Sequence, residues 1–257
     1  MYWRYAAGML LALGLVISAT AADRTTPQPD PRIAQLVQRW AIDAVQTTSL
    51  WVKIQQTRTN PVFRNAPPEI KQGEAKFMKL PDGSFGVRIE LANPQDPSDF
   101  ERFIYTGTHL YQLRSREKVV NVVPISPQQV SSAPDDGPLG FLFGMSADSA
   151  WKRYKFAVTK EYDGYMHVQI TPNFAKDQQD FTRAELAIVN RDQPKIPKDM
   201  PKYISFVEPN NVQVTWYVDE LERNAGKRVQ AKDFTAPAVP AGWQKVVQPV
   251  PGNEKTR

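Results

Sequence analysis

Most of this chain has a hydrophobic pattern with a period of two residues. In one clear example, Phe85, Val87, Ile89 and Leu91 alternate with small or polar neighbours. Such alternation is typical of a β-strand with one buried and one solvent-exposed face. These segments are short, because turn residues and many of the 22 prolines interrupt them, and proline is confined to turns, edge strands and linkers. The pattern therefore predicts many short antiparallel strands.

The predicted strands follow one another as an antiparallel meander of about ten to eleven strands. The turn Pro81-Asp82-Gly83 joins two of them as a hairpin. Together the predicted strands cover residues 49–57, 74–80, 85–91, 100–105, 109–113, 118–123, 154–162, 165–171, 183–190, 202–208 and 212–223.

Two segments have a helical pattern instead. Asp30 is an N-cap candidate, and Pro31 follows at the first helical position. Apolar residues then recur at helical spacing, so we expect an amphipathic helix from Pro31 to Gln46 that presses Trp40 onto an apolar surface. A second helical stretch is expected between residues 135 and 151, where the sequence is apolar and rich in glycine.

These elements predict a mainly β (α+β) fold. A flat sheet of so many strands curls or splits. We therefore expect a single strongly curved antiparallel sheet that forms an open half-barrel, closed by the N-terminal helix and by a short apolar lid-like helix. A curved sheet has a concave face, and where helices fill that face only in part, the remaining space is an apolar cavity.

The N-terminal residues 1–21 have the features of a secretory signal peptide. Arg4 precedes an apolar run, and Ala19 and Ala21 have the A-x-A spacing of a cleavage site. An uncleaved membrane anchor is the alternative, but the apolar run is shorter than the ~20 residues that a spanning helix needs. We expect cleavage after Ala21 and a soluble product that is periplasmic or otherwise exported.

The remaining sequence is expected to form one domain. The predicted boundaries are a flexible lead at 22–30, a half-barrel domain at 31–247 and a flexible tail at 248–257.

The residue types exclude several kinds of chemistry. The chain has no cysteine and two histidines, His109 and His167, so it has no disulfide, no thiolate nucleophile, no zinc finger and no multi-histidine metal centre. Neither histidine has a catalytic partner at a diagnostic spacing, and Ser146 and Ser149 lack a G-x-S-x-G context. We expect no metal, no cofactor and no enzymatic activity.

The charge of the chain points to no particular macromolecule. The formal net charge is +5, and removal of Arg4 with the leader lowers it by one. A small excess among many acidic residues is typical of a mixed, solvated surface. The phosphate-binding patterns G-x-x-x-x-G-K-[ST] and G-x-G-x-x-G are both missing from the sequence. We therefore expect no nucleic-acid partner.

Several short motifs occur in the order that one known family has. They are Gln55-Gln56-Thr57, Gly73-Glu74, Phe77-Met78-Lys79-Leu80-Pro81, Tyr105-Thr106-Gly107-Thr108-His109-Leu110-Tyr111, Val168-Gln169-Ile170-Thr171-Pro172, Phe234-Thr235-Ala236-Pro237 and Pro240-Ala241-Gly242-Trp243. In this order the segment 33–243 resembles the lipoprotein-carrier superfamily of LolA and LolB, whose fold is an open half-barrel closed by helices. More narrowly, residues 180–186 and 200–202 resemble the exported, uncharacterised LolA-like proteins of planctomycete-type bacteria.

One departure limits what this resemblance implies. The carrier's first hairpin has Lys-Arg-Pro, its arginine being linked to lid closure, whereas the matching residues here are Lys79, Leu80 and Pro81. A closing mechanism that uses this arginine is therefore not carried over, and neither is lipoprotein shuttling that depends on it. Without a lipobox cysteine, the chain is nearer to the soluble carrier than to the lipid-anchored LolB.

The candidate ligand-binding residues come from two sources. The apolar segment 139–145 lies where the resemblance places a lid across the cavity mouth, and it is interpreted either as a movable gate or as a core helix that plugs the half-barrel. Its candidate residues are Leu139, Phe141, Leu142, Phe143 and Met145. The residues expected to face the same interior, as cavity wall or as ordinary core, are Trp40, Val87, Ile89, Leu91, Val212, Val214 and Trp216.

Two loose groups of basic residues have two interpretations. They form a solvated rim, or they meet lipid phosphates at the cavity mouth, at about 1 kcal/mol per charge near an anionic surface. The groups are Arg114, Arg116 and Lys118, and Lys152, Arg153 and Lys155.

Three functional hypotheses follow. The first is an exported, monomeric carrier or chaperone that holds the acyl chains of lipids or lipoproteins and meets membrane-associated donor and acceptor proteins. The second is an envelope sensor or protein-interaction domain on the same fold, which requires a filled cavity. The third is an enzyme, which requires converging polar groups inside the cavity.

Overall fold

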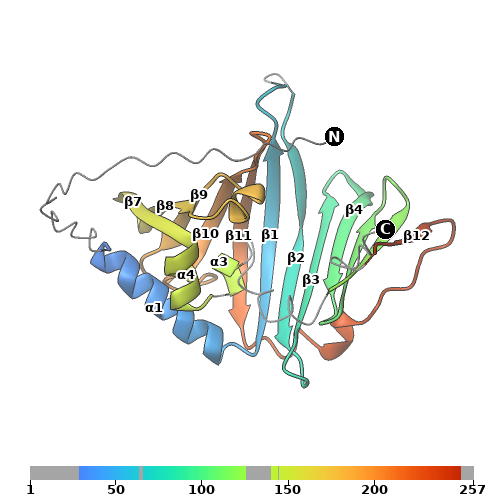
Figure 1. Ribbon diagram of the computed structural model, residues 1–257, viewed down its shortest axis with the longest axis horizontal. Coiled ribbons are helices and arrows are strands. Elements are labelled where there is room, and N and C mark those ends of the chain that lie inside the picture. Colours follow the sequence, from blue (N-terminus) through green and yellow to red (C-terminus); the bar gives the residue numbers. More distant parts are fainter. Residues whose placement is uncertain (1–28, 64–65, 126–139, 144, 250–257) are drawn as a thin grey trace, which may run out of the picture.

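The computed structural model describes residues 29–63, 66–125, 140–143 and 145–249 (Figure 1). Their main feature is one twelve-stranded sheet with the strand order β12-β6-β5-β4-β3-β2-β1-β11-β10-β9-β8-β7. All neighbouring strands are antiparallel except β12, which runs parallel to β6. The order is linear, so β7 and β12 are two free edges and the sheet is open.

The strands follow one another along the chain with short connections. They are β1 Ser49–Thr59, β2 Glu69–Lys79, β3 Phe85–Asn93, β4 Asp96–Tyr105, β5 His109–Arg114, β6 Val119–Pro124, β7 Tyr154–Tyr162, β8 Tyr165–Pro172, β9 Arg183–Val189, β10 Pro201–Val207, β11 Gln213–Arg223 and β12 Gln244–Val247.

The helices in the described ranges are few and, apart from the first, short. They are α1 Pro31–Gln46, α3 Gly140–Phe143 and α4 Ala147–Arg153, with the 3-10 helices η1 Asp177–Gln179 and η2 Ala231–Phe234. Figure 1 shows α1, α3 and α4 together on one face of the sheet, over the half that contains β7 to β11. None of the helices in the described part of the chain has the length and apolar character needed to cross a bilayer.

The structure confirms the predicted first helix from Pro31 to Gln46. Asp30 is its N-cap, and its side chain accepts a hydrogen bond from the backbone N–H of Arg32. The apolar stripe is buried, and the indole N–H of Trp40 donates to the carbonyl of Asp199 at 2.8 Å. At the other end, Lys79 Nζ donates to the carbonyls of Ala44 and Val45 at 2.9 and 2.8 Å. A cation at this position suits the partial negative charge of a helix C-terminus.

Three details of the expected fold need correction. The sheet has twelve strands, because the short β12 was not predicted from its sequence. The sheet is not wholly antiparallel, since the C-terminal segment returns to β6 in the parallel direction. The described residues of the second helical stretch form two helices, α3 and α4, and the Ser146 side chain caps the start of α4. The predicted leader 1–21 lies outside the described residues.

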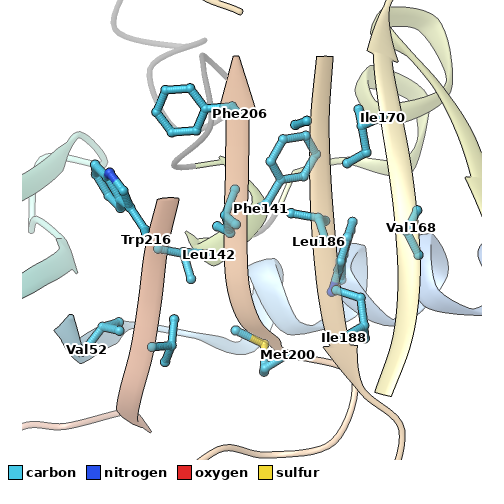
Figure 2. Close-up of a cluster of buried hydrophobic side chains, with 14 of the residues drawn as sticks. Val52, Phe141, Leu142, Val168, Ile170, Leu186, Ile188, Met200, Phe206 and Trp216 are labelled. Carbon is cyan, nitrogen blue, oxygen red and sulfur yellow. The ribbon is translucent and has the colours of Figure 1, made fainter. Parts of the chain in front are cut away.

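The main core lies between the helices and the sheet. Figure 2 shows buried side chains of β8 to β11 on one side of the sheet, with Phe141 and Leu142 of α3 among them. Phe141 has its ring 6.1 Å from that of Trp40 and 5.4 Å from that of Tyr154. These contacts attach α3 to both α1 and β7.

The opposite face carries two smaller clusters that the C-terminal segment covers. Trp51 and Phe234 are buried together in one of them, and Leu113 with Val120 lies in the other, where Trp243 stacks on Phe100 at 5.9 Å. The C-terminal residues therefore protect the β6 side of the sheet, and β12 covers an edge that would otherwise be β6.

Candidate functional site

A cavity of about 660 Å³ opens on the helix-bearing face, over the strands that no described helix covers. This volume lies in the range of about 300–1,000 Å³ that small-molecule sites have. The lining residues come from β1 to β5, from β10 and β11, and from the segment after η1. They are Gln56, Arg58, Glu69, Lys71, Ile89, Leu91, Glu101, Phe103, Gln112, Arg114, Asp180, Phe206 and Trp216.

The floor of this cavity is apolar. We define the floor as Ile89, Leu91, Phe103, Phe206 and Trp216. Leu91 is 2% exposed and Trp216 is 9% exposed, so the floor continues directly into the buried core. Strand geometry explains this arrangement, because side chains two residues apart point to the same face.

One end of the cavity carries charges instead. We define the charged rim as Arg58, Glu69, Lys71, Glu101 and Arg114. Lys71 lies at its centre with its side chain only 6% exposed, and Nζ lies 2.8 Å from Glu101 and 3.4 Å from Glu69. A buried ammonium group is stable only with such partners.

The outer arginines of the charged rim are more accessible. Arg58 pairs with Glu208 at 2.7 Å and Arg114 pairs with Glu117 at 3.2 Å. Their side chains are 41% and 40% exposed. Ion pairs of this kind contribute little to stability, so both arginines are able to exchange partners with a ligand.

The helix-covered half of the same face is filled. The void between α1, α3 and the sheet measures about 10 Å³, which is at the lower limit for one water molecule. Trp40, Phe141 and Leu142 line it, together with Leu50 and Met200 among others. The two halves therefore differ, since one is close-packed core and the other is a hollow.

The structure places the predicted ligand-binding residues in both halves. Ile89, Leu91 and Trp216 line the cavity. Val87 is partly buried and packs against the adjoining core cluster. Most of the other predicted residues are buried within this cluster, namely Trp40, Phe141, Leu142, Met145, Val212 and Val214. Phe143 belongs to α3, and Leu139 lies outside the described residues. Whether segment 139–145 moves as a gate stays a prediction.

Sequence reasoning missed the polar part of the lining. Gln56 and Arg58 continue the inward-facing series of β1 that begins with Leu50, Val52 and Ile54. The alternation along β1 therefore indicated that both side chains face the cavity. They were missed because an apolar cavity was expected, and polar side chains were expected to face solvent. Lys71 and Glu101 were missed for the same reason.

The two basic groups have different surroundings. Arg114 does lie at the cavity, as one interpretation expected, while its neighbour Arg116 pairs with Asp99. In the second group, Arg153 is held by Asp177 at 2.6 Å, with both side chains largely buried. Arg153 is therefore a structural residue.

His167 is buried on the face opposite to the cavity. Its Nδ1 lies 2.9 Å from Glu185 Oε1, and the Tyr203 hydroxyl donates to the same oxygen at 2.8 Å. Burial raises the pKa of Glu185, but these hydrogen bonds outweigh it and bring that pKa below its ordinary value. Burial and the Glu185 carboxylate raise the pKa of Tyr203.

The described residues hold no group of three or more histidine, cysteine or acidic side chains placed to bind a metal. The described lining of the cavity includes no histidine, serine, threonine or tyrosine, so the arrangement offers apolar surface and fixed charges to a ligand.

No protein-family model and no curated protein matches the chain. Solved structures similar to it include an uncharacterized conserved protein from Thermus thermophilus, with 13% identity and a TM-score of 0.45 over 84% of this chain and 99% of that one. A DUF1329 family protein from Desulfovibrio piger has 10% identity and a TM-score of 0.45 over 83% and 100%. A LolA superfamily protein from Nitrosomonas europaea has 9% identity and a TM-score of 0.38 over 79% and 97%. At such scores these similarities establish neither the family nor the ligand of this chain.

Proposed function

We propose that this protein binds the acyl chain of a lipid or of a lipid-modified protein in the cavity and acts as a carrier or chaperone for it. One observation carries the proposal: the described helices fill the face beside β7 to β11, whereas a hollow of about 660 Å³ lies over β1 to β5 and extends to Phe206 of β10 and Trp216 of β11. Such a hollow beside a close-packed core is a departure from normal interior packing.

The floor and the charged rim suit an amphiphile. Each methylene group that leaves water contributes about 0.8 kcal/mol, so one chain on the floor gains enough for reversible binding. The charged rim lies at one end of the cavity and keeps a polar head near solvent. A wholly apolar ligand would leave these charges desolvated, which is unfavourable.

The cavity argues against the alternative of an envelope sensor or protein-interaction domain, which requires a filled interior. The third hypothesis, an enzyme, required converging polar groups inside the cavity. The polar groups in the described lining are ion-paired lysine, arginine and carboxylate groups, together with Asp180 and the amides of Gln56 and Gln112. The ion-paired groups position and neutralise one another, and we propose that they bind and orient rather than catalyse.

A bulky residue in the cavity tests the proposal. In Gln56→Trp an indole fills part of the hollow, whereas Gln55→Trp places the same group on the opposite face of β1. We expect Gln56→Trp to weaken the binding of a fluorescent fatty acid by about tenfold or more, and Gln55→Trp to leave it unchanged.

Solvent extraction of the purified protein and mass spectrometry provide an independent measurement. We expect the wild type to carry lipid and Gln56→Trp to carry less. If the wild type carries no lipid and takes up no fluorescent fatty acid, the proposal is wrong.

The cellular setting is part of the same proposal. We propose that residues 1–21 are removed, that the domain 31–247 works as a monomer outside the cytoplasm, and that donor and acceptor proteins at membranes exchange the ligand with it. Cleavage after Ala21 predicts a mature chain that begins at Ala22, which N-terminal sequencing of the exported protein checks.

A further inference from the structure

The charges of the rim form a series of neighbours in which each charge lies beside one of opposite sign. Arg58 of β1 is the register partner of Glu69 of β2, and Glu101 of β4 is the partner of Arg114 of β5. Lys71 joins the two pairs, because its Nζ contacts both carboxylates. The charged rim therefore reads positive, negative, positive, negative, positive along one end of the cavity.

Among the described residues the lining is balanced in charge. Asp180 is the sixth charged residue of this described lining, which therefore holds three cationic and three carboxylate side chains. At the spacing of neighbouring strands, ~5 Å, an isolated anion beside either arginine also lies close to a carboxylate. Attraction and repulsion then largely cancel, and an isolated cation meets the same difficulty.

A head that carries both charges avoids this conflict. Its anion faces an outer arginine while its cation faces the neighbouring carboxylate, so each group of the head replaces an accessible ion pair with an equivalent one. The outer groups are accessible for such an exchange, since Arg58, Arg114 and Glu69 each have a side chain about 40% exposed.

We infer that the ligand of this cavity is a zwitterionic amphiphile, in which an acyl chain is joined to a head that carries one anionic group and one ammonium group. This inference rests on the proposed function and adds the chemical class of the head. The acyl chain lies on the floor. The charged rim selects the head because a head with a single uncompensated charge binds to it less tightly.

The test compares three single-chain amphiphiles of equal chain length below their micelle concentrations. Lysophosphatidylethanolamine is zwitterionic, lysophosphatidylglycerol is anionic and an alkyltrimethylammonium is cationic. Isothermal titration calorimetry of the full mature chain measures each Kd. We expect the zwitterionic amphiphile to bind about tenfold more tightly than either singly charged one.

Two variants shift the preference in opposite directions. Glu69→Gln removes a carboxylate, so the anionic amphiphile gains affinity relative to the zwitterionic one. Arg114→Gln removes a cation, so the cationic amphiphile gains instead. The control is Arg183→Gln on the opposite face of the sheet, which leaves all three affinities unchanged.

The outcomes separate the two proposals. Equal affinity of the wild type for all three amphiphiles, or an order that the rim variants do not change, overturns the zwitterionic head and leaves the binding of acyl chains intact. If the wild type binds none of the three, the proposed function itself is overturned.

Discussion

Gly73 of β2 is a position beside the cavity at which no side chain fits. A Cβ atom there would lie 1.8 Å from the carbonyl oxygen of Glu90 in the neighbouring strand β3. The obstacle is backbone, so it cannot rotate away as a side chain would. The close approach of these two strands next to Leu91 therefore depends on glycine.

Gly73→Ala is expected to destabilise the fold by at least about 2 kcal/mol, because β2 and β3 must separate to admit the methyl group. Gly226→Ala is the matched control, since nothing lies within 4 Å of a Cβ atom at that position. Urea unfolding of both variants measures the difference. Equal stability of the two variants would show that the strands are able to relax.

The second prediction at this scale concerns Glu185. Its pKa in the folded protein is below the ordinary value of 4.5, because the hydrogen bonds from Tyr203 and His167 outweigh burial. The ionised carboxylate therefore stabilises the fold above pH 4.5, and this contribution is lost as the pH falls below that value.

We expect Glu185→Gln to be less stable than the wild type at neutral pH and the difference to shrink as the pH falls below 4.5. The side chain is 43% exposed, which keeps the effect within about 1 kcal/mol. Thermal unfolding across this pH range measures it. Tyr203→Phe removes one hydrogen-bond donor to Glu185 and should reduce the pH dependence of stability. If the pH dependence is unchanged in this variant, it arises from other groups.

At the scale of elements, α1 is fastened at both ends. Asp30 caps its first turn, and Lys79 of β2 donates to two carbonyls of its last turn. The cap was predictable from the sequence because capping is local. The Lys79 contact was not, since it joins residues more than 30 positions apart and depends on where the sheet places β2.

Lys79→Met is expected to lower the free energy of unfolding by about 1–2 kcal/mol, since two charge-assisted hydrogen bonds are lost at a helix C-terminus. Lys53→Met is the control, because Lys53 is exposed on β1 and substitutions at such sites change stability by less than about 0.5 kcal/mol. Chemical denaturation measures the free energy of unfolding of both variants, and circular dichroism measures their helix content. If both variants lose the same free energy of unfolding, the hydrogen bonds of Lys79 to α1 do not stabilise the fold as proposed.

The elements also differ in how well they could be predicted from the sequence. The helix at Pro31–Gln46 and the hairpin across Pro81-Asp82-Gly83 were predicted correctly, because period and turn chemistry are properties of the local chain. The strand β12 was not, since Gln244–Val247 has no alternating pattern and all four of its residues are exposed. Only its pairing with β6 makes it a strand.

At the scale of the whole molecule, the sequence predicted a mainly β sheet with helices on one face, but not how the space on that face is divided. Leu91 and Leu142 look alike in the sequence, as apolar residues in apolar segments. Leu91 borders the hollow, and Leu142 lies in close-packed core. Unfilled volume depends on the distance between elements, and residue identities do not contain that distance.

This division predicts that substitutions in the filled half mainly reduce stability, whereas substitutions in the hollow half mainly reduce ligand binding. Phe141 is 1% exposed and lies in the filled half, so Phe141→Ala should cost about 3–5 kcal/mol. Phe103 lines the hollow and is only partly buried. Its truncation enlarges a space that already exists, and we expect Phe103→Ala to cost about 1 kcal/mol.

Binding should show the opposite order. Phe103→Ala removes part of the floor and should weaken the binding of a fluorescent fatty acid, whereas Phe141→Ala should retain it at a temperature where the variant is folded. Unfolding with and without the fatty acid measures both quantities, because a ligand of the folded state raises the free energy of unfolding by an amount that grows with the logarithm of its affinity. If Phe141→Ala loses binding while Phe103→Ala keeps it, the ligand enters the helix-covered half, and α3 must then move out of the core to admit it.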